Sequence, residues 1–167
     1  MSATRGETTG FLQGLVNPGL IFTGLPAGAV EDVVSDLSRR VADAGAVRDP
    51  VDLSRRLLER ERLGCTGLGA GIAIPHCKLK DLDEIVLAVA SCPGGADFHS
   101  PDGVLVTLIF LILSPAEAPA LHLQALARIS RLLRTPGVAD SLRSAQTPAD
   151  LFAAVKEAES AVPAVRP

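Results

Sequence analysis

The sequence predicts an α/β fold, in which a single domain is built on a mixed β-sheet of about five strands with helices on both faces. Two apolar runs, at 85–91 and 104–113, are continuous rather than alternating. Continuous runs of this length are typical of strands that are covered on both faces of a sheet. Segments with helical spacing of apolar residues precede and follow these runs, and the 167 residues show no internal repeat. One domain of mixed layers is therefore expected.

The first half of the chain predicts a short strand followed by two helices. Residues 20–22 form an apolar triplet between two glycines, a pattern typical of a strand. From residue 29 to about residue 44, apolar residues recur every three or four positions, as on one face of an amphipathic helix. Asp49 fits the N-cap of a second helix and Pro50 its first position, and Gly64 is expected to end it.

The second half contains the two runs that predict the buried strands. Residues 85–91 form the first, and the Cys-Pro-Gly-Gly sequence at 92–95 is expected to end it. A turn at 101–103 then leads into residues 104–113, which give the strongest strand signal in the chain. A shorter strand-like run, Ile-Ala-Ile, lies earlier at 72–74.

Three helices are predicted after these strands. The longest covers residues 121–133, and a short one covers Val138–Arg143. The last begins with Thr147 as N-cap and Pro148 at the first helical position. In the longest helix, the side chains expected to face inward are Leu123, Leu126, Ile129, Leu132 and Leu133.

The limits of the domain and its compartment follow from the ends of the chain and from its apolar runs. The domain is expected over residues 15–161, with a flexible leader at 1–14 and a frayed tail at 162–167. The leader is polar, so a secretory signal is not expected, and residues 104–113 are too few to span a bilayer as a helix. Three widely spaced cysteines make a poor disulfide framework. A cytoplasmic protein without membrane insertion is predicted.

The charge and the aromatic content argue against nucleic acid as a partner. The formal net charge is −3, and charged residues make up 21% of the chain, so no broad basic field is available for a phosphate backbone. Tyr and Trp are absent, which removes the usual stacking platforms for single strands.

The most unusual segment of the chain is residues 64–78, where four glycines precede a proline and a histidine. Glycines at 64, 67, 69 and 71 allow positive φ and close backbone approach, so they can form a wall that no side chain obstructs. Pro75 stiffens the segment that presents His76. A core histidine is the alternative, but the position on a proline-fixed turn favours a functional ring. Lys78, two residues on, is either a cation near this ring or a solvated lysine.

The other two histidines have different settings. His122 lies at the start of a predicted helix, where backbone N–H groups and the helix dipole favour anions. The alternative for His122 is a polar residue on an exposed helix face. His99 lies in a loop with no comparable context and is expected to be a surface residue.

Other chemistries fit the sequence less well. Cys65 and Cys77 with two histidines allow a zinc site in principle, but no pair shows the usual ligand spacing, and no metal is predicted. The glycine segment is no P-loop, because Gly71 is followed by Ile72 rather than by lysine. No G-x-S-x-G elbow is present, which argues against a serine hydrolase.

The remaining chemistry is transfer of a small anion on a histidine. Imidazole titrates near neutrality and offers a nitrogen lone pair as nucleophile. A phosphoryl group on His76 would need hydrogen-bond donors and polar or cationic neighbours. The predicted pocket is made of His122, Arg60, Thr66, and the backbone of Gly67, Gly69 and Gly71.

Residues 60–78, RERLGCTGLGAGIAIPHCK, resemble the signature of enzyme IIA domains of the bacterial phosphotransferase system, fructose/mannitol type. Two further segments are similar: 102–111 resembles the central strand of this family, and His122-Leu123 with Leu126-Ala127 resembles its second-histidine helix. The likeness covers about residues 19–158 in the correct order. The sequence departs at Cys65, where the family has Ser or Thr, so one hydroxyl is missing.

The resemblance implies a fold, a reaction and partners. His76 would accept a phosphoryl group from an HPr-like phosphocarrier protein, His122 would stabilise or orient the phosphorylated ring, and Arg60 would hold the phosphoryl charge. No cofactor is implied. Two roles are open at this point: a regulatory protein of the nitrogen-regulatory (PtsN-like) branch, acting on a kinase or transporter, or a transport protein that passes phosphate to an enzyme IIB domain for fructose/mannitol-type sugar uptake.

Overall fold

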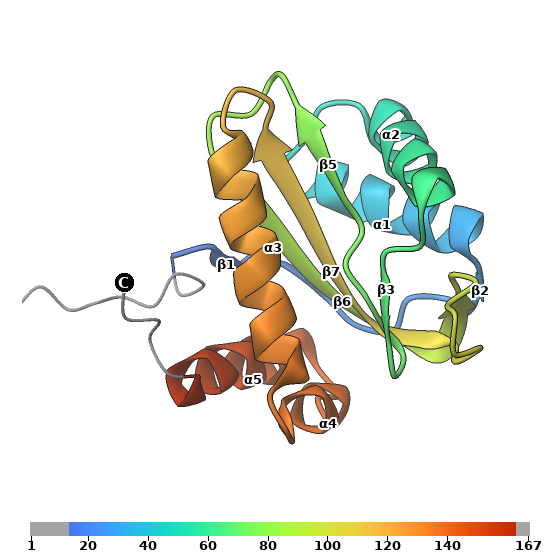
Figure 1. The fold of residues 1–167 in the computed structure, drawn as a ribbon, viewed down its shortest axis with the longest axis vertical. Helices are drawn as coiled ribbons and strands as arrows, with labels where there is room; N and C mark the ends of the chain where they lie inside the picture. Colours follow the sequence, from blue (N-terminus) through green and yellow to red (C-terminus); the bar gives the residue numbers. More distant parts are fainter. Residues whose placement is uncertain (1–13, 163–167) are drawn as a thin grey trace, which may run out of the picture.

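The computed structural model describes residues 14–162 and contains five helices and a seven-stranded sheet (Figure 1). The remaining parts of the expected leader and tail, 1–13 and 163–167, lie outside the described residues. No helix within 14–162 is long and apolar enough to cross a membrane. The elements in chain order are β1 (Val16–Phe22), β2 (Gly28–Ala29), α1 (Val30–Asp43), α2 (Pro50–Leu63), β3 (Gly67–Gly69), β4 (Ile72–Ala73), β5 (His76–Leu79), β6 (Val86–Asp97), β7 (Val106–Pro115), α3 (Pro119–Arg134), α4 (Val138–Arg143) and α5 (Pro148–Ala161).

The sheet is mixed, as predicted, with the antiparallel pair β6–β7 at its centre. On one side, β1 and the short β2 both pair parallel with β6. On the other side, β4 and β5 pair parallel with successive parts of β7, and β3 pairs antiparallel with β4. The additional strands over the expected five are short pieces of two to four residues, which carry little sequence signal.

Both faces of the sheet are covered, which confirms the prediction from the continuous apolar runs. Along β7, Phe110 and Ile112 pack in a core with residues of α3, α4 and α5. Their neighbours Leu111 and Leu113 pack in a second core with residues of α1 and α2. Successive side chains of a strand point to opposite faces, so one central strand contributes to both cores. Figure 1 shows the two helical layers on either side of the strands.

The helix boundaries that the capping residues predicted are confirmed. The carboxylate of Asp49 accepts hydrogen bonds from the backbone N–H groups of Val51 and Asp52, each over 3.0 Å, at the start of α2. At the start of α5, the Thr147 hydroxyl accepts from the backbone N–H of Asp150, whose carboxylate accepts in return from the N–H of Thr147. Such reciprocal caps satisfy N–H groups that have no partner within the helix.

Several strand boundaries differ from the prediction, and the strand expected at 20–22 already begins at Val16. The expected break at 92–95 is wrong, because β6 continues through this segment to Asp97. The proline and glycines form an irregularity in the register with β7, between Ser91 and Ala96, rather than an end. The strand predicted at 104–113 begins two residues later, at Val106.

The helix predicted at 121–133 is present as α3, but one of its inward-facing residues was wrongly assigned. Leu123 is 67% exposed, whereas His122 is only 6% exposed. The buried face contains His122, Ala125 and Ile129, which recur at three- and four-residue spacing. The first turn of α3 therefore presents a histidine to the interior and leucines to the surface.

Candidate active site

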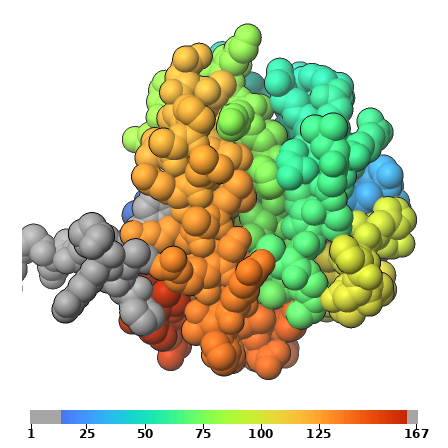
Figure 2. All heavy atoms as spheres, viewed as in Figure 1, coloured from blue at the N-terminus to red at the C-terminus, as the bar shows by residue number. Residues whose placement is uncertain are grey.

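The site lies at β5, a strand of four residues beside β7 and between α3 and α2 (Figure 1). His76 pairs with Ile112, and Cys77 pairs with Leu113. Since these partners belong to opposite cores, His76 points to the layer of α3, and Cys77 packs in the layer of α1 and α2. In the space-filling view of Figure 2, the green atoms of this region form a strip between orange α3 and teal α2.

Cys77 is therefore separated from the histidine by the sheet. Burial raises the pKa of the Cys77 thiol to about 12, against a smaller lowering by the charge of Arg56. The thiol stays protonated near neutral pH and is a poor nucleophile. Among residues 14–162, no group of three His, Cys, Asp or Glu side chains could hold a metal ion.

The tautomer of His76 is fixed by its backbone partner. Nδ1 lies 2.8 Å from the carbonyl oxygen of Ile74. A carbonyl oxygen only accepts hydrogen bonds, so Nδ1 carries the proton and Nε2 carries the lone pair. Burial lowers the pKa of His76, as does the charge of Arg60, against raising effects from the Ile74 carbonyl and Glu61. At neutral pH the ring is neutral, and its nucleophilic atom is Nε2.

Arg60 approaches this nitrogen from the last turn of α2. Its Nε donates to Nε2 of His76 over 3.3 Å, and its Nη1 donates to the carbonyl oxygen of Gly64 over 3.0 Å. Helix α2 belongs to the opposite layer from α3, so Arg60 reaches His76 around the edge of β5. The guanidinium keeps further N–H donors in a planar fork that suits phosphate oxygens.

A chain of hydrogen bonds links Glu61 of α2 to His76. Thr66 belongs to this chain, whereas its hydroxyl was expected to bind the phosphoryl group. The hydroxyl and the backbone N–H of Thr66 donate to the Glu61 carboxylate, over 2.6 and 2.9 Å. The carbonyl oxygen of Thr66 accepts from the N–H of Ile74 over 3.0 Å, and the Ile74 carbonyl accepts from Nδ1 of His76. Glu61 was not predicted as a site residue, although it lies in the motif at 60–78. Its contacts with Thr66 make it a functional candidate.

His122 comes to the pair from the first turn of α3. Its ring centroid is 5.2 Å from that of His76, with the ring planes inclined by 54°. Burial lowers the pKa of His122, and the charges of His76, Lys78 and Arg60 lower it further. The structure thus brings His76, His122 and Arg60 together, although they belong to three different elements. His99, by contrast, is exposed on its loop, as predicted.

The glycines form a hairpin away from the imidazole. Ile72 pairs with Leu108 and His76 with Ile112, so the β3–β4 turn at 69–71 is about 13 Å further along the sheet than His76. Gly69 and Gly71 have φ of +86° and +77°, and the Asp102 carboxylate accepts from the N–H of Ala70 over 2.8 Å. Gly67 pairs with Ala73 at the near end of the hairpin. The structure does not bring Gly69 and Gly71 to the ring of His76.

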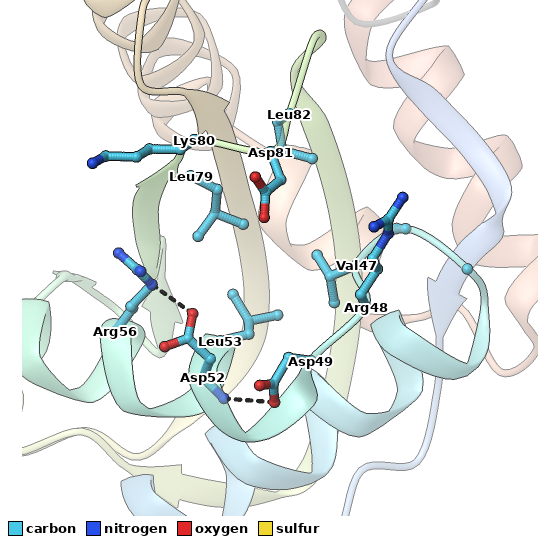
Figure 3. Close-up of a pocket in the computed structure, with 12 residues that line it drawn as sticks. Val47, Arg48, Asp49, Asp52, Leu53, Arg56, Leu79, Lys80, Asp81 and Leu82 are labelled. Carbon is cyan, nitrogen blue, oxygen red and sulfur yellow. Dashed lines mark hydrogen bonds and ion pairs between the residues drawn. The ribbon is translucent and has the colours of Figure 1, made fainter.

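A separate hollow lies at the far end of β5, on the side of α1 and α2 (Figure 3). Its volume is about 330 Å³, and its apolar side chains include Val47, Leu53, Leu79 and Leu82. None of the three residues gathered at the site lines it. The histidine pair is thus distinct from this hollow.

Comparisons with known proteins identify the family of this chain. Residues 14–158 match the family model of the phosphoenolpyruvate-dependent sugar phosphotransferase system, EIIA 2. The chain belongs to this family. As a type 2 enzyme IIA domain, it is a phosphoryl-transfer component of that system.

The relatives of this type 2 enzyme IIA include both regulatory and transport proteins. A nitrogen regulatory protein of Pseudomonas aeruginosa is 34% identical over 149 residues, which cover 89% of this chain and 97% of the relative. A fructose-specific EIIA component of Haloferax volcanii is 37% identical over 135 residues, covering 79% and 88% of the two chains. A phosphocarrier role fits both kinds of relative.

Solved structures share the fold of this enzyme IIA domain. The nitrogen regulatory protein IIA-Ntr of Neisseria meningitidis has a TM-score of 0.77 at 25% identity, covering 85% of this chain and 97% of that one. IIA mannitol from Escherichia coli has a TM-score of 0.70 at 22% identity, covering 84% and 98% of the two chains, and so supports the fold alone.

Proposed function

We propose that this protein is a histidine phosphocarrier whose acceptor atom is Nε2 of His76. The observation that carries the proposal is the hydrogen bond between Nδ1 of His76 and the Ile74 carbonyl, which leaves the lone pair on Nε2 beside Arg60. A neutral ring with one free nitrogen is the form of histidine that attacks phosphorus.

The transfer conserves atoms and charge between two imidazole rings. The donor is a phosphohistidine protein of the HPr type, with its second ring nitrogen protonated. The P–N bond to the donor breaks as the P–Nε2 bond to His76 forms, and the donor leaves as a neutral imidazole. His76 keeps its proton on Nδ1 and becomes a cationic ring. The Ile74 carbonyl, which accepts from Nδ1, stabilises that charge.

Arg60 changes partners during this step. In the resting protein its Nε–H rests on the lone pair of Nε2. Attack on phosphorus uses that lone pair, so the N–H must turn away, and the nearest new acceptors are the oxygens of the incoming phosphoryl group. The guanidinium neutralises their charge and His122 stabilises the phosphorylated ring.

Thr66 and the glycines act differently in this proposal. The Thr66 hydroxyl is bound to Glu61, and the hairpin turn is distant from His76, which supports a role in holding the histidine segment. Direct donation to the phosphoryl group by Thr66, Gly67, Gly69 and Gly71 stays a prediction.

The surface around the histidines suits docking of another protein. Leu63 at the end of α2 is 86% exposed, and Leu121 and Leu123 in the first turn of α3 are 42% and 67% exposed. They belong to the same helix ends that carry Arg60 and His122. Exposed apolar side chains around a reactive group favour a protein donor and a protein recipient.

We place a regulatory role of the nitrogen-regulatory type first, because the relative from Pseudomonas aeruginosa is matched over 97% of its length, against 88% for the fructose-specific relative, and IIA-Ntr has a higher TM-score than IIA mannitol, 0.77 against 0.70. Transport of a fructose-type sugar through an enzyme IIB domain is the second candidate, supported by the fructose-specific relative. The three free cysteines fit a reducing compartment, and we place the protein in the cytoplasm.

The test is phosphotransfer in vitro from phosphoenolpyruvate through enzyme I and HPr. We expect one acid-labile phosphate per chain, on Nε2 of His76, and no label on His76→Gln. Label on that variant at the wild-type level would refute the acceptor assignment. Adding a fructose-type enzyme IIB then separates the two roles, since rapid loss of label to IIB is expected only of the transport protein.

A further inference from the structure

The His122 ring is hydrogen-bonded to the buried hydroxyl of Ser114, which has no role in the reaction proposed above. Nδ1 of His122 lies 2.7 Å from Oγ of Ser114. Ser114 is the second-to-last residue of β7, is 0% exposed, and pairs with Lys78 of β5. It lies two residues after Ile112, on the face of the sheet that α3 covers.

The direction of this hydrogen bond follows from the donors available. A serine hydroxyl has one proton to donate, and a neutral imidazole has one N–H and one lone pair. Within residues 14–162, the Ser114 side chain makes this one hydrogen bond. If Nδ1–H donated to Oγ, the hydroxyl proton would have no acceptor among these residues, in a fully buried position, which is costly. The hydroxyl is therefore the donor and Nδ1 the acceptor.

We propose that Ser114 is a positioning residue, whose O–H donates to Nδ1 of His122 and so keeps the proton of that ring on Nε2, ready for a phosphoryl oxygen on His76. The inference rests on the proposed function, since it gives His122 its task in that reaction. It also explains how a neutral ring stabilises the phosphorylated state. With Nδ1 accepting from Ser114, Nε2–H is the donor that the His122 ring offers.

The same contact fixes the orientation of the ring. A half-turn about the bond from Cβ to the ring would replace Nδ1 by a carbon and break the bond to Ser114. Rotation of a buried ring at the cost of a hydrogen bond is rare at equilibrium, so the donor keeps one direction. Pre-set donors of this kind need no reorganisation when the charge arrives.

The first test reads the tautomer directly, in the unphosphorylated protein. Long-range ¹H–¹⁵N spectra of the His122 ring should show an unprotonated Nδ1 and a protonated Nε2. Ser114→Ala should move both signals toward values averaged between tautomers, and Ser114→Thr, which keeps the hydroxyl, should restore the wild-type pattern. A wild-type spectrum with a protonated Nδ1 would overturn the proposal without any variant being needed.

The matched control is Ser38→Ala. Ser38 is also 0% exposed, and its hydroxyl has no hydrogen-bond partner among the described residues. It lies on α1, in the other layer. This variant removes a buried hydroxyl without touching the site, so its His122 spectrum should match that of the wild type.

The second test measures the lifetime of the phosphorylated protein. Ser114→Ala should shorten it about three- to tenfold, the size expected for loss of one hydrogen bond. In a His122→Ala background the same change should have no further effect. Additive effects of the two changes would overturn the positioning role. Failure of the proposed function would appear elsewhere, as labelling of His76→Gln, and would leave the tautomer result intact.

Discussion

Nε of Arg60 lies 3.3 Å from Nε2 of His76, so the cation expected to bind the phosphoryl group is hydrogen-bonded to the atom expected to attack phosphorus. Arg60→Lys keeps the charge but removes the planar fork and the Nε–H. We expect phosphoryl uptake from phospho-HPr to slow by roughly 100-fold, as for loss of one charge-stabilising donor. Stopped-flow or rapid-quench labelling measures this rate. Arg62→Lys, in the same helical turn, is the control and should be unaffected; equal rates for both variants would contradict the role of Arg60.

Thr66→Val tests the chain of hydrogen bonds that begins at Glu61. Thr66 is buried, and its hydroxyl donates to the carboxylate over 2.6 Å, so valine leaves that carboxylate short of a donor. The free energy of unfolding should fall by about 1–3 kcal/mol, measured by urea denaturation. Thr66→Ser keeps the donor and should recover most of it. If valine is as stable as serine, the contact does not support the fold.

Phosphoryl uptake by His76 should persist to a lower pH than it would on a histidine with the ordinary pKa. Burial and Arg60 lower the pKa of His76, so the nucleophilic neutral form persists below about pH 6.5. The unfolded chain binds this proton more tightly than the folded one, so this ring also reduces stability as the pH falls below that value. An NMR titration of His76, alongside uptake rates over about pH 5–8, measures both effects. A midpoint above the ordinary histidine value would contradict this prediction.

The cysteines should differ sharply in reactivity. Cys65 is exposed, whereas burial raises the pKa of Cys77 to about 12. At pH 8 roughly one Cys77 in 10,000 would then be a thiolate. Iodoacetamide should therefore modify Cys65 first, and phosphoryl uptake should survive modification, as peptide mass spectrometry and labelling would show. Rapid alkylation of Cys77 in the folded protein would argue against its placement.

Gly71→Ala tests whether the hairpin glycines are needed for the fold. Gly71 has a φ of +77°, and a Cβ there would lie 3.1 Å from the carbonyl oxygen of Leu105. We expect a loss of about 1–3 kcal/mol in the free energy of unfolding. A Cβ on Gly64 would meet no atom within 4 Å, and its φ of 164° is extended, so Gly64→Ala should change stability by less than about 0.5 kcal/mol. Similar losses in both variants would contradict the steric argument.

Much of the fold could be predicted because its signals are local. The caps at Asp49 and Thr147 mark helix starts by hydrogen bonds within one turn, and the continuous run in β7 reports burial on both faces. Strand β5 could not be predicted in this way. It has four residues, follows a proline and contains an exposed lysine, and only its pairing with β7 makes it a strand.

The same difference between local signals and long-range contacts applies to the candidate site. The motif and the start of a helix predicted His76, His122 and Arg60 as site residues. The structure shows that they lie close together. Ser114 was not predicted, because its role depends on a contact between β7 and α3 that no spacing in the sequence expresses. The exposed Leu123 was misassigned for a related reason: the interior of the first turn of α3 is polar, so the apolar pattern gave the wrong face.

His76 and Cys77 point to opposite faces of the sheet, and this limits the insertions and deletions that the segment before His76 can tolerate. One residue inserted between the hairpin and His76, with the pairing to β7 kept, would move the imidazole into the hydrophobic layer and bring the thiol to face His122. Two inserted residues would restore the original facing. An odd number of insertions or deletions in this short connection should abolish phosphorylation even if the protein folds, whereas an even number need not.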